Sequence, residues 1–103
     1  MQMTLCYIPT GNKETADQLS TLAIEAKLAA CANIFPVTSF YPWEGAMQHD
    51  SEVVLLLKTI PSLKKQLQAF ILDHHPYDVP CVMQWDVDVN DAYATWIIDC
   101  VRK

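Results

Sequence analysis

Several features common in other protein classes are missing from this 103-residue sequence. It has only two glycines, Gly11 and Gly45, so we expect few loops and tight ones. No apolar run approaches the roughly 20 residues that a transmembrane helix needs, so we expect no membrane partner. Basic residues form no cluster longer than a pair and the net charge is −5, which argues against nucleic acid as a partner.

The four cysteines include no Cys-x-x-Cys pair, which excludes the usual zinc-finger spacings. The strand-like run after Met1 lacks the basic start of a signal peptide, so we expect a cytoplasmic protein with reduced thiols. The composition is 51% apolar and 18% charged, which indicates one folded domain over residues 1–103. That apolar fraction is high for a small monomer, so we expect a partner subunit to cover part of the surface.

Hydrophobic periodicity, prolines and glycines predict four strands and three helices. Pro9 is expected to end the first strand, Pro36 to lie at a sheet edge or bulge, and Asn12 and Asn90 to cap helices. Strands are expected at 2–8, 31–43, 46–60 and 80–89, and helices at 13–29, from Pro61 to about His74, and at 91–101. This β-α-β-β-α-β order with a terminal helix predicts an α+β, ferredoxin-like fold.

The second and third strands are expected to form a long antiparallel hairpin around Glu44-Gly45. The third strand carries five consecutive apolar residues, 53–57, so both of its faces should be buried. Helices can cover one face of a two-layer domain. The other face then needs a partner, which we expect to be another copy of this chain.

The last strand alternates between apolar Met83 and Trp85 and polar Gln84, Asp86 and Asp88. We expect the polar set to be a solvated strand face. Two alternating carboxylates can also bind a hard cation, but this pattern is weak evidence for such a site.

Two motifs together resemble one protein family. Tyr-x-Trp-x-Gly occupies 41–45, and His-Pro-Tyr-x-x-Pro occupies 75–80. With the segments at 28–34, 50–53 and 58–59, they resemble the CutA family of divalent-cation tolerance proteins in order and spacing over nearly the whole chain. The resemblance implies a ferredoxin-like fold, a homotrimer built by strand pairing between subunits, a PII-like assembly, cytoplasmic location and binding of copper or another divalent metal.

The resemblance also implies a set of metal ligands. Family members with two histidines at this loop are credited with copper ligands there and at a cysteine of the first strand. The matching residues are Cys6, His74 and His75. Imidazole and thiolate suit copper and zinc. The chain departs from the family at Cys81, where a glutamate is usual.

The residue patterns leave a structural interpretation open for each of these ligands. Adjacent residues of a helix point about 100° apart, so His74 and His75 can share one ion only because Pro76 takes His75 off the helix. Both imidazoles can instead stabilise a helix C-terminus. Cys6, between Leu5 and Tyr7, can be a small buried core residue.

A candidate cleft between subunits is the second functional feature. Aromatic residues near the hairpin can line a pocket or pack at a subunit boundary. Lys58 is a candidate anion ligand or an ion-pair partner of a glutamate. The candidate cleft residues are Tyr41, Trp43, Glu44, Lys58 and Tyr77.

The favoured function is therefore a trimeric divalent-cation tolerance protein that binds copper or another divalent metal and is not an enzyme. An alternative is a PII-like signalling trimer that binds small molecules in clefts between subunits. A third hypothesis is an enzyme in which His75 acts as base and Glu44 as acid across a subunit boundary. No catalytic motif of known spacing supports that hypothesis.

Overall fold

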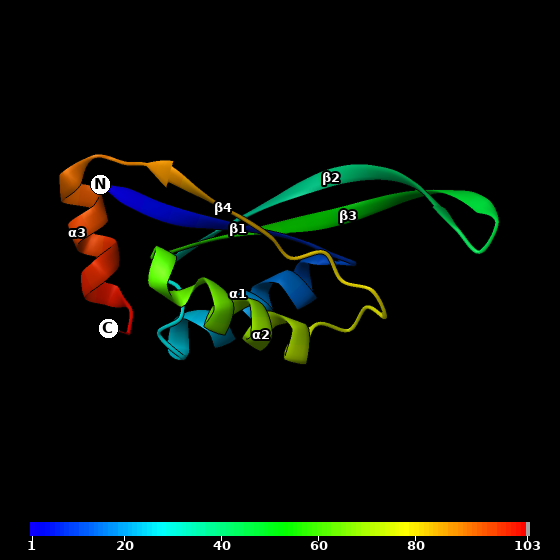
Figure 1. Cartoon of the computed structure of the whole chain (residues 1–103). Coiled ribbons are helices and arrows are strands. Elements are labelled where there is room, and N and C mark those ends of the chain that lie inside the picture. The colour runs from blue at the N-terminus through cyan, green and yellow to red at the C-terminus, as the bar shows by residue number, and fades with distance from the viewer. Residues whose placement is uncertain (103) are drawn as a thin grey trace.

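A computed structural model describes residues 1–102 and has one four-stranded antiparallel sheet with helices against it (Figure 1). The strand order is β2-β3-β1-β4, which confirms the expected α+β arrangement. The strands are β1 (Gln2–Thr10), β2 (Cys31–Trp43), β3 (Ala46–Thr59) and β4 (Met83–Asp88). The helices are α1 (Lys13–Glu25), a 3₁₀ turn η1 (Pro61–Leu63), α2 (Lys64–His74) and α3 (Asp91–Cys100).

The β2–β3 hairpin is the longest feature of the molecule and extends beyond the rest of the sheet (Figure 1). Glu44 and Gly45 form its two-residue turn with φ of 51° and 79°, as such hairpin turns require. Starting from the hydrogen-bonded pair Trp43–Ala46, hydrogen-bonded and non-hydrogen-bonded pairs alternate along the hairpin. Pro36 belongs to a non-hydrogen-bonded pair, so its nitrogen points away from β3. β2 is an edge strand, so the expectation for Pro36 is confirmed.

β1 runs past the point where we expected it to end. Pro9 was predicted to break the strand, yet it pairs with Val54 of β3, and Thr10 pairs with Val53. The Pro9 carbonyl points to the opposite side, where it accepts a hydrogen bond from His75. In a strand the nitrogen and carbonyl of one residue point the same way, so the missing N–H of Pro9 removes no bond to β3.

One continuous core lies between the sheet and helices α1 and α2. Alternate residues of β1 and β3 point into it, and small residues of α1 let that helix approach the sheet closely. Its buried residues include Cys6, Ile8, Ala16, Leu19, Ala23, Leu28, Ala29, Leu55, Leu57, Leu67 and Ile71.

The first helix ends at Glu25, four residues before the expected position 29. Lys27 adopts a left-handed conformation with φ of 58°. The N–H of Leu28 donates to the Ala23 carbonyl and the N–H of Lys27 to the Ile24 carbonyl, which is a Schellman motif. The motif turns Leu28 back into the core, although the left-handed position is usually a glycine. The sequence pattern alone did not reveal this ending.

The polar side of β4 faces the helix layer, so our prediction of a solvated face was wrong for Gln84 and Asp86, whereas Asp88 is exposed as expected. Asp86 accepts hydrogen bonds from Thr4 at 2.6 Å and from Lys64 at 3.0 Å, and these contacts hold its pKa below the usual value. Gln84 donates to the Lys64 carbonyl. The polar alternation therefore anchors the start of α2 to the sheet.

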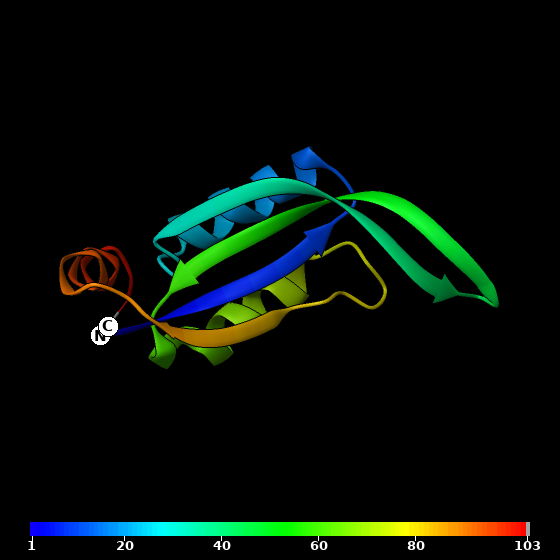
Figure 2. The ribbon, with the colours of Figure 1, turned by 90° about the horizontal axis from the view of Figure 1, so that it is seen from above.

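The opposite face of the sheet has no helix lying across it (Figure 2). Register places apolar side chains from all four strands on this face. Trp85 is 41% exposed and Met83 is 50% exposed. The members of this surface, which we call the open face, are Leu5, Tyr7, Phe35, Leu56, Met83 and Trp85.

Helix α3 lies at the end of the sheet where β1 begins (Figure 1). Asn90 occupies the N-cap position as expected, but its side chain makes no capping hydrogen bond, whereas the side chain of Asn12 accepts from Thr15 N–H at 2.8 Å. Tyr93 of α3 contacts the Lys58 ammonium, which lies 5.3 Å from the ring centroid. Among residues 1–102, no helix has the length and apolar character needed to cross a membrane.

The left-handed Lys27 generates a stability prediction. Lys27→Gly should raise the free energy of unfolding by roughly 0.5–1 kcal/mol, because glycine lacks the Cβ that makes this conformation unfavourable. Urea unfolding measures the change. Lys27→Ala is the matched control, since it removes the same side chain but keeps the Cβ and should give no gain. An equal gain from both variants would contradict this interpretation.

Candidate functional site

His75 is a buried bridge between the end of β1 and the loop after α2. It follows the last residue of α2 and has extended backbone angles, with φ of −75° and ψ of 133°, as Pro76 favours. His75 is buried, with only 8% of its surface exposed. Nδ1 accepts a hydrogen bond from Tyr77 N–H at 3.1 Å, so Nε2 carries the proton that it donates to the Pro9 carbonyl at 2.8 Å. Both ring nitrogens are therefore occupied.

His74 has a different environment, because it is exposed at the last position of α2. Its Nδ1 lies 2.8 Å from the Phe70 carbonyl, to which it donates, and its ring packs against Phe70 with centroids 4.3 Å apart. The lone pair of Nε2 is then free. Of the two adjacent histidines, His74 is the one with a nitrogen available for a metal ion.

Cys6 is fully buried on the helix side of the sheet, opposite Leu57 of β3 and Gln84 of β4. Burial raises the pKa of its thiol to about 12, so the thiolate that binds metals is strongly disfavoured. This placement agrees with the interpretation of Cys6 as a core residue.

The structure does not bring the three residues implied by the resemblance into one set of ligands. No group of three or more His, Cys, Asp or Glu side chains suited to a metal ion occurs within residues 1–102. His74 is exposed, while Cys6 and His75 are buried with their donor atoms engaged or protonated. A single chain therefore offers one accessible imidazole from this set.

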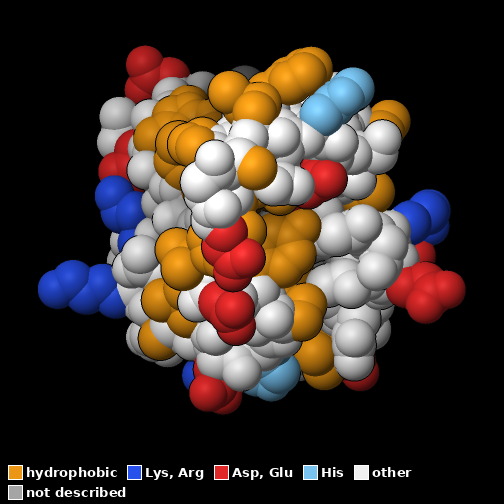
Figure 3. All heavy atoms as spheres, turned by 90° about the vertical axis from the view of Figure 1, so that its right-hand side faces the viewer, with side chains coloured by type: hydrophobic (Ala, Val, Ile, Leu, Met, Phe, Trp, Pro, Cys, Tyr) orange, Lys and Arg blue, Asp and Glu red, His pale blue; other side chains and the backbone are white. Residues whose placement is uncertain are grey.

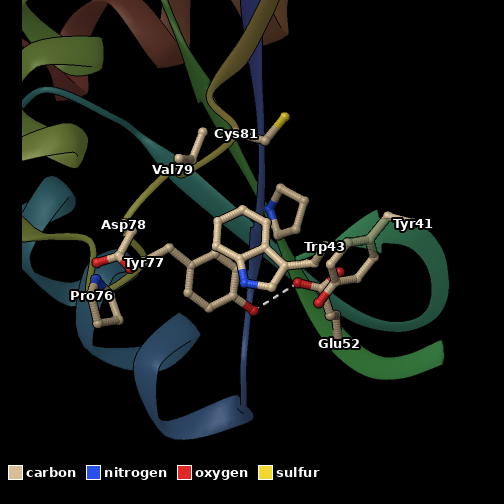
Figure 4. Close-up of a pocket in the computed structure, with 9 residues that line it drawn as sticks. Tyr41, Trp43, Glu52, Pro76, Tyr77, Asp78, Val79 and Cys81 are labelled. Carbon is tan, nitrogen blue, oxygen red and sulfur yellow. Dashed lines mark hydrogen bonds between the residues drawn. The ribbon is translucent and has the colours of Figure 1, made fainter. Parts of the chain in front are cut away.

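A pocket of about 520 Å³ lies between the same loop and the outer half of the β2–β3 hairpin (Figure 4). Tyr77 donates a hydrogen bond to Glu52 at 2.7 Å, which joins the loop to β3. Tyr41 donates in the same way to Asp50. The pocket is lined by Pro9, by Tyr41, Trp43 and Glu52 of the hairpin, and by 76–79 and Cys81 of the loop.

Three of the five predicted cleft residues line this pocket: Tyr41, Trp43 and Tyr77. Glu44 lies in the hairpin turn and does not line it. Lys58 lies near the other end of β3, where its ammonium is 3.3 Å from the Tyr93 hydroxyl. No Lys or Arg among residues 1–102 lines the pocket, so a single chain supplies it with no cation for an anionic ligand.

Glu52 is one of the six pocket residues that the sequence analysis did not place there. It is only 9% exposed. Strand alternation puts it on the same side of the hairpin as Asp50, and its cross-strand neighbour on β2 is Val37. A carboxylate directly before the apolar run 53–57 was the available signal. Its partner Tyr77 is distant in sequence, so the contact required the fold.

Comparison with known proteins identifies the family. The model of the family described as "CutA1 divalent ion tolerance protein" matches residues 4–100, almost the whole chain. The chain belongs to this family. The resemblance in the two motifs is thereby confirmed.

Individual CutA proteins agree with this assignment. The chain is 37% identical to the divalent-cation tolerance protein CutA of Pyrococcus horikoshii, over 98% of this chain and 100% of that protein. It is 38% identical to a chloroplastic CutA of Arabidopsis thaliana, but spans only 54% of that protein. The crystal structure of CutA1 from Pyrococcus horikoshii superposes with a TM-score of 0.94 at 36% identity, over 97% of this chain and 99% of that one.

The His75 bridge generates a prediction about this CutA chain. His75→Ala should lower the free energy of unfolding by about 1–3 kcal/mol, because the Pro9 carbonyl and the Tyr77 N–H lose a buried partner. Urea unfolding measures this loss, and hydrogen exchange at Tyr77 should become faster. His74→Ala removes a neighbouring exposed imidazole and should change stability by less than about 0.5 kcal/mol. Equal effects of the two substitutions would refute the bridge.

Proposed function

We propose that this chain is a divalent-cation tolerance protein that binds copper or another divalent ion and has no enzymatic activity. The observation that carries the proposal is the family match over residues 4–100. The matched Pyrococcus horikoshii relative, named for divalent-cation tolerance, is covered over its whole length, which supports transfer of the role to a single domain spanning residues 1–103. Cytoplasmic location is part of the proposal and is supported by four free cysteines.

The absence of enzymatic activity is supported by the environment of the candidate base. Both nitrogens of His75 are engaged by backbone groups, so neither can take a proton from a substrate while the bridge persists. Glu44, the candidate acid, is exposed in the hairpin turn. An acid–base pair of these two residues is therefore not supported within one chain.

Metal binding is proposed to start at His74. Its free Nε2 on an exposed ring suits copper and other divalent ions of the first transition row. Cys6 and His75 stay in the proposed set only as secondary ligands. Each would first have to lose burial or a hydrogen bond, so one protein imidazole with water as the other ligands predicts weak binding.

Isothermal titration of chelator-treated protein with copper(II) tests this site. His74→Ala should weaken copper binding roughly tenfold or more, since removing a supporting residue of a metal site already has an effect of that size. His49→Ala is the matched control, because His49 is an exposed histidine of the hairpin that stacks on Phe40. Unchanged copper affinity in His74→Ala would remove the site from the end of α2.

We also propose that the chain assembles as a homotrimer through the open face and the sheet edges. The open face carries apolar side chains from every strand, which is typical of a surface that a partner covers. β2 and β4 are the outer strands of the sheet, so each has an edge to pair with another subunit. Closed rotational symmetry is the usual solution for identical subunits with such surfaces.

Sedimentation velocity at micromolar concentration tests the assembly. The unmodified chain should sediment as a trimer, and Trp85→Glu should shift it toward monomer because a charge is introduced on the open face. Ile24→Glu is the control, since Ile24 is 39% exposed on α1, in the helix layer. A monomeric unmodified chain, or equal dissociation of both variants, would refute this assembly.

A further inference from the structure

The pocket beside the 76–81 loop is lined by aromatic and acidic side chains that have no part in the metal site proposed at His74. Its walls come from three parts of the chain that are far apart in sequence: Pro9 of β1, the outer half of the hairpin, and the loop between α2 and β4 (Figure 4). The Tyr77–Glu52 hydrogen bond and the His75 bridge hold these parts together. The pocket is thus built by the fold rather than by one flexible segment.

Within residues 1–102 of a single chain, the negative charge at the pocket has no basic counterpart. Glu52 and Asp78 line it, and neither forms an ion pair with a Lys, Arg or His within residues 1–102. Glu52 as a residue is only 9% exposed, and its carboxylate accepts a hydrogen bond from the neutral phenol of Tyr77. A carboxylate in a partly enclosed pocket attracts a positively charged group, so a cation would be stabilised beside Glu52.

The nearby carboxylates help to raise the pKa of the two phenols of the pocket. Burial and the hydrogen bond to Glu52 raise the pKa of Tyr77. The hydrogen bond to Asp50 raises the pKa of Tyr41, with a further contribution from Glu52. Both phenols donate hydrogen bonds to carboxylates of β3, Tyr41 to Asp50 and Tyr77 to Glu52. On the end of the molecule where the hairpin points at the viewer, acidic and apolar side chains share the centre, and Lys and Arg lie at the margins (Figure 3).

Aromatic rings supply the second half of the argument. Trp43 is 44% exposed and Tyr77 is 37% exposed, although both line the pocket. The faces of Trp and Tyr rings attract cations through their quadrupoles, and a Trp with Tyr partners is the usual wall for quaternary ammonium groups. Aromatic walls next to a carboxylate without an ion-pair partner favour a cation with an apolar surface, such as a quaternary ammonium group.

We propose that this pocket binds an organic ammonium cation. A bare metal ion fits it less well, because no group of three suitable ligands occurs within residues 1–102. Organic anions are disfavoured by Glu52 and Asp78. Lys58 of the same chain cannot fill the pocket, because it contacts Tyr93 near the other end of β3. His74 itself does not line the pocket.

Titration calorimetry with choline chloride, in the presence of a chelator, tests the proposal. Choline should bind saturably, and its neutral isostere, in which carbon replaces the quaternary nitrogen, should bind at least tenfold more weakly. The chelator removes metal ions, so this result is independent of copper binding at His74. Equal binding of choline and its isostere, or no binding of choline, would overturn the proposal.

Two substitutions locate the site. Glu52→Gln keeps an oxygen that can accept from Tyr77 but removes the charge, and should weaken choline binding about tenfold. Trp43→Leu removes an exposed ring and should weaken it similarly, which tests the site even if Glu52→Gln does not fold. Glu25→Gln is the charge-matched control. The start of α1, at Asn12, is the end of the helix near the pocket residue Pro9, and Glu25 is at the other end, roughly 20 Å away along the helix axis. Glu25→Gln should leave binding unchanged.

Alkylation gives an independent location. Cys81 is exposed and lines the pocket, so choline should slow its reaction with N-ethylmaleimide. Peptide mapping by mass spectrometry follows each cysteine, and Cys31, which does not line the pocket, serves as the internal reference. Binding that leaves Cys81 reactivity unchanged would place the cation elsewhere and refute the proposed site.

Discussion

The imidazole of His75 is the contact on which the functional end of this molecule depends. One ring connects the carbonyl of Pro9, at the end of a central strand, with the backbone of Tyr77 in the loop after α2. Tyr77 then reaches Glu52, and the loop closes one wall of the pocket. Pro76 contributes by ending α2 at His74, so that His75 leaves the helix and turns inward. Histidine is a common metal ligand, but at this position the side chain of His75 has a structural role.

Local signals in the sequence predicted most of the architecture. The order of strands and helices follows from hydrophobic periodicity. Pro36 marked an edge strand and Glu44-Gly45 marked the hairpin turn, because both constrain the backbone directly. The family motifs added an expectation of function, and comparison over residues 4–100 confirmed the family. Three pocket residues were also expected from the same aromatic motifs.

The errors have a common origin in long-range geometry. The ending of α1 at Glu25 depends on a left-handed lysine, which composition does not distinguish from an ordinary helical one. The polar side of β4 faces inward because Thr4 and Lys64 meet Asp86 there. His75 could be recognised as a bridge only through Pro9, which is 66 residues away in sequence. None of these partners is visible from periodicity.

The prolines of the hairpin have a consequence for aggregation. Pro36 and Pro42 both occupy positions of β2 whose nitrogens point to the free edge, so this edge lacks hydrogen-bond donors at two places six residues apart. A foreign strand could form an uninterrupted ladder only in short stretches on either side of each proline. Stacking of chains into fibrils needs long unbroken ladders, and these two residues limit it. Pro36 and Pro42 also restrict the register in which a strand of another subunit can pair with β2.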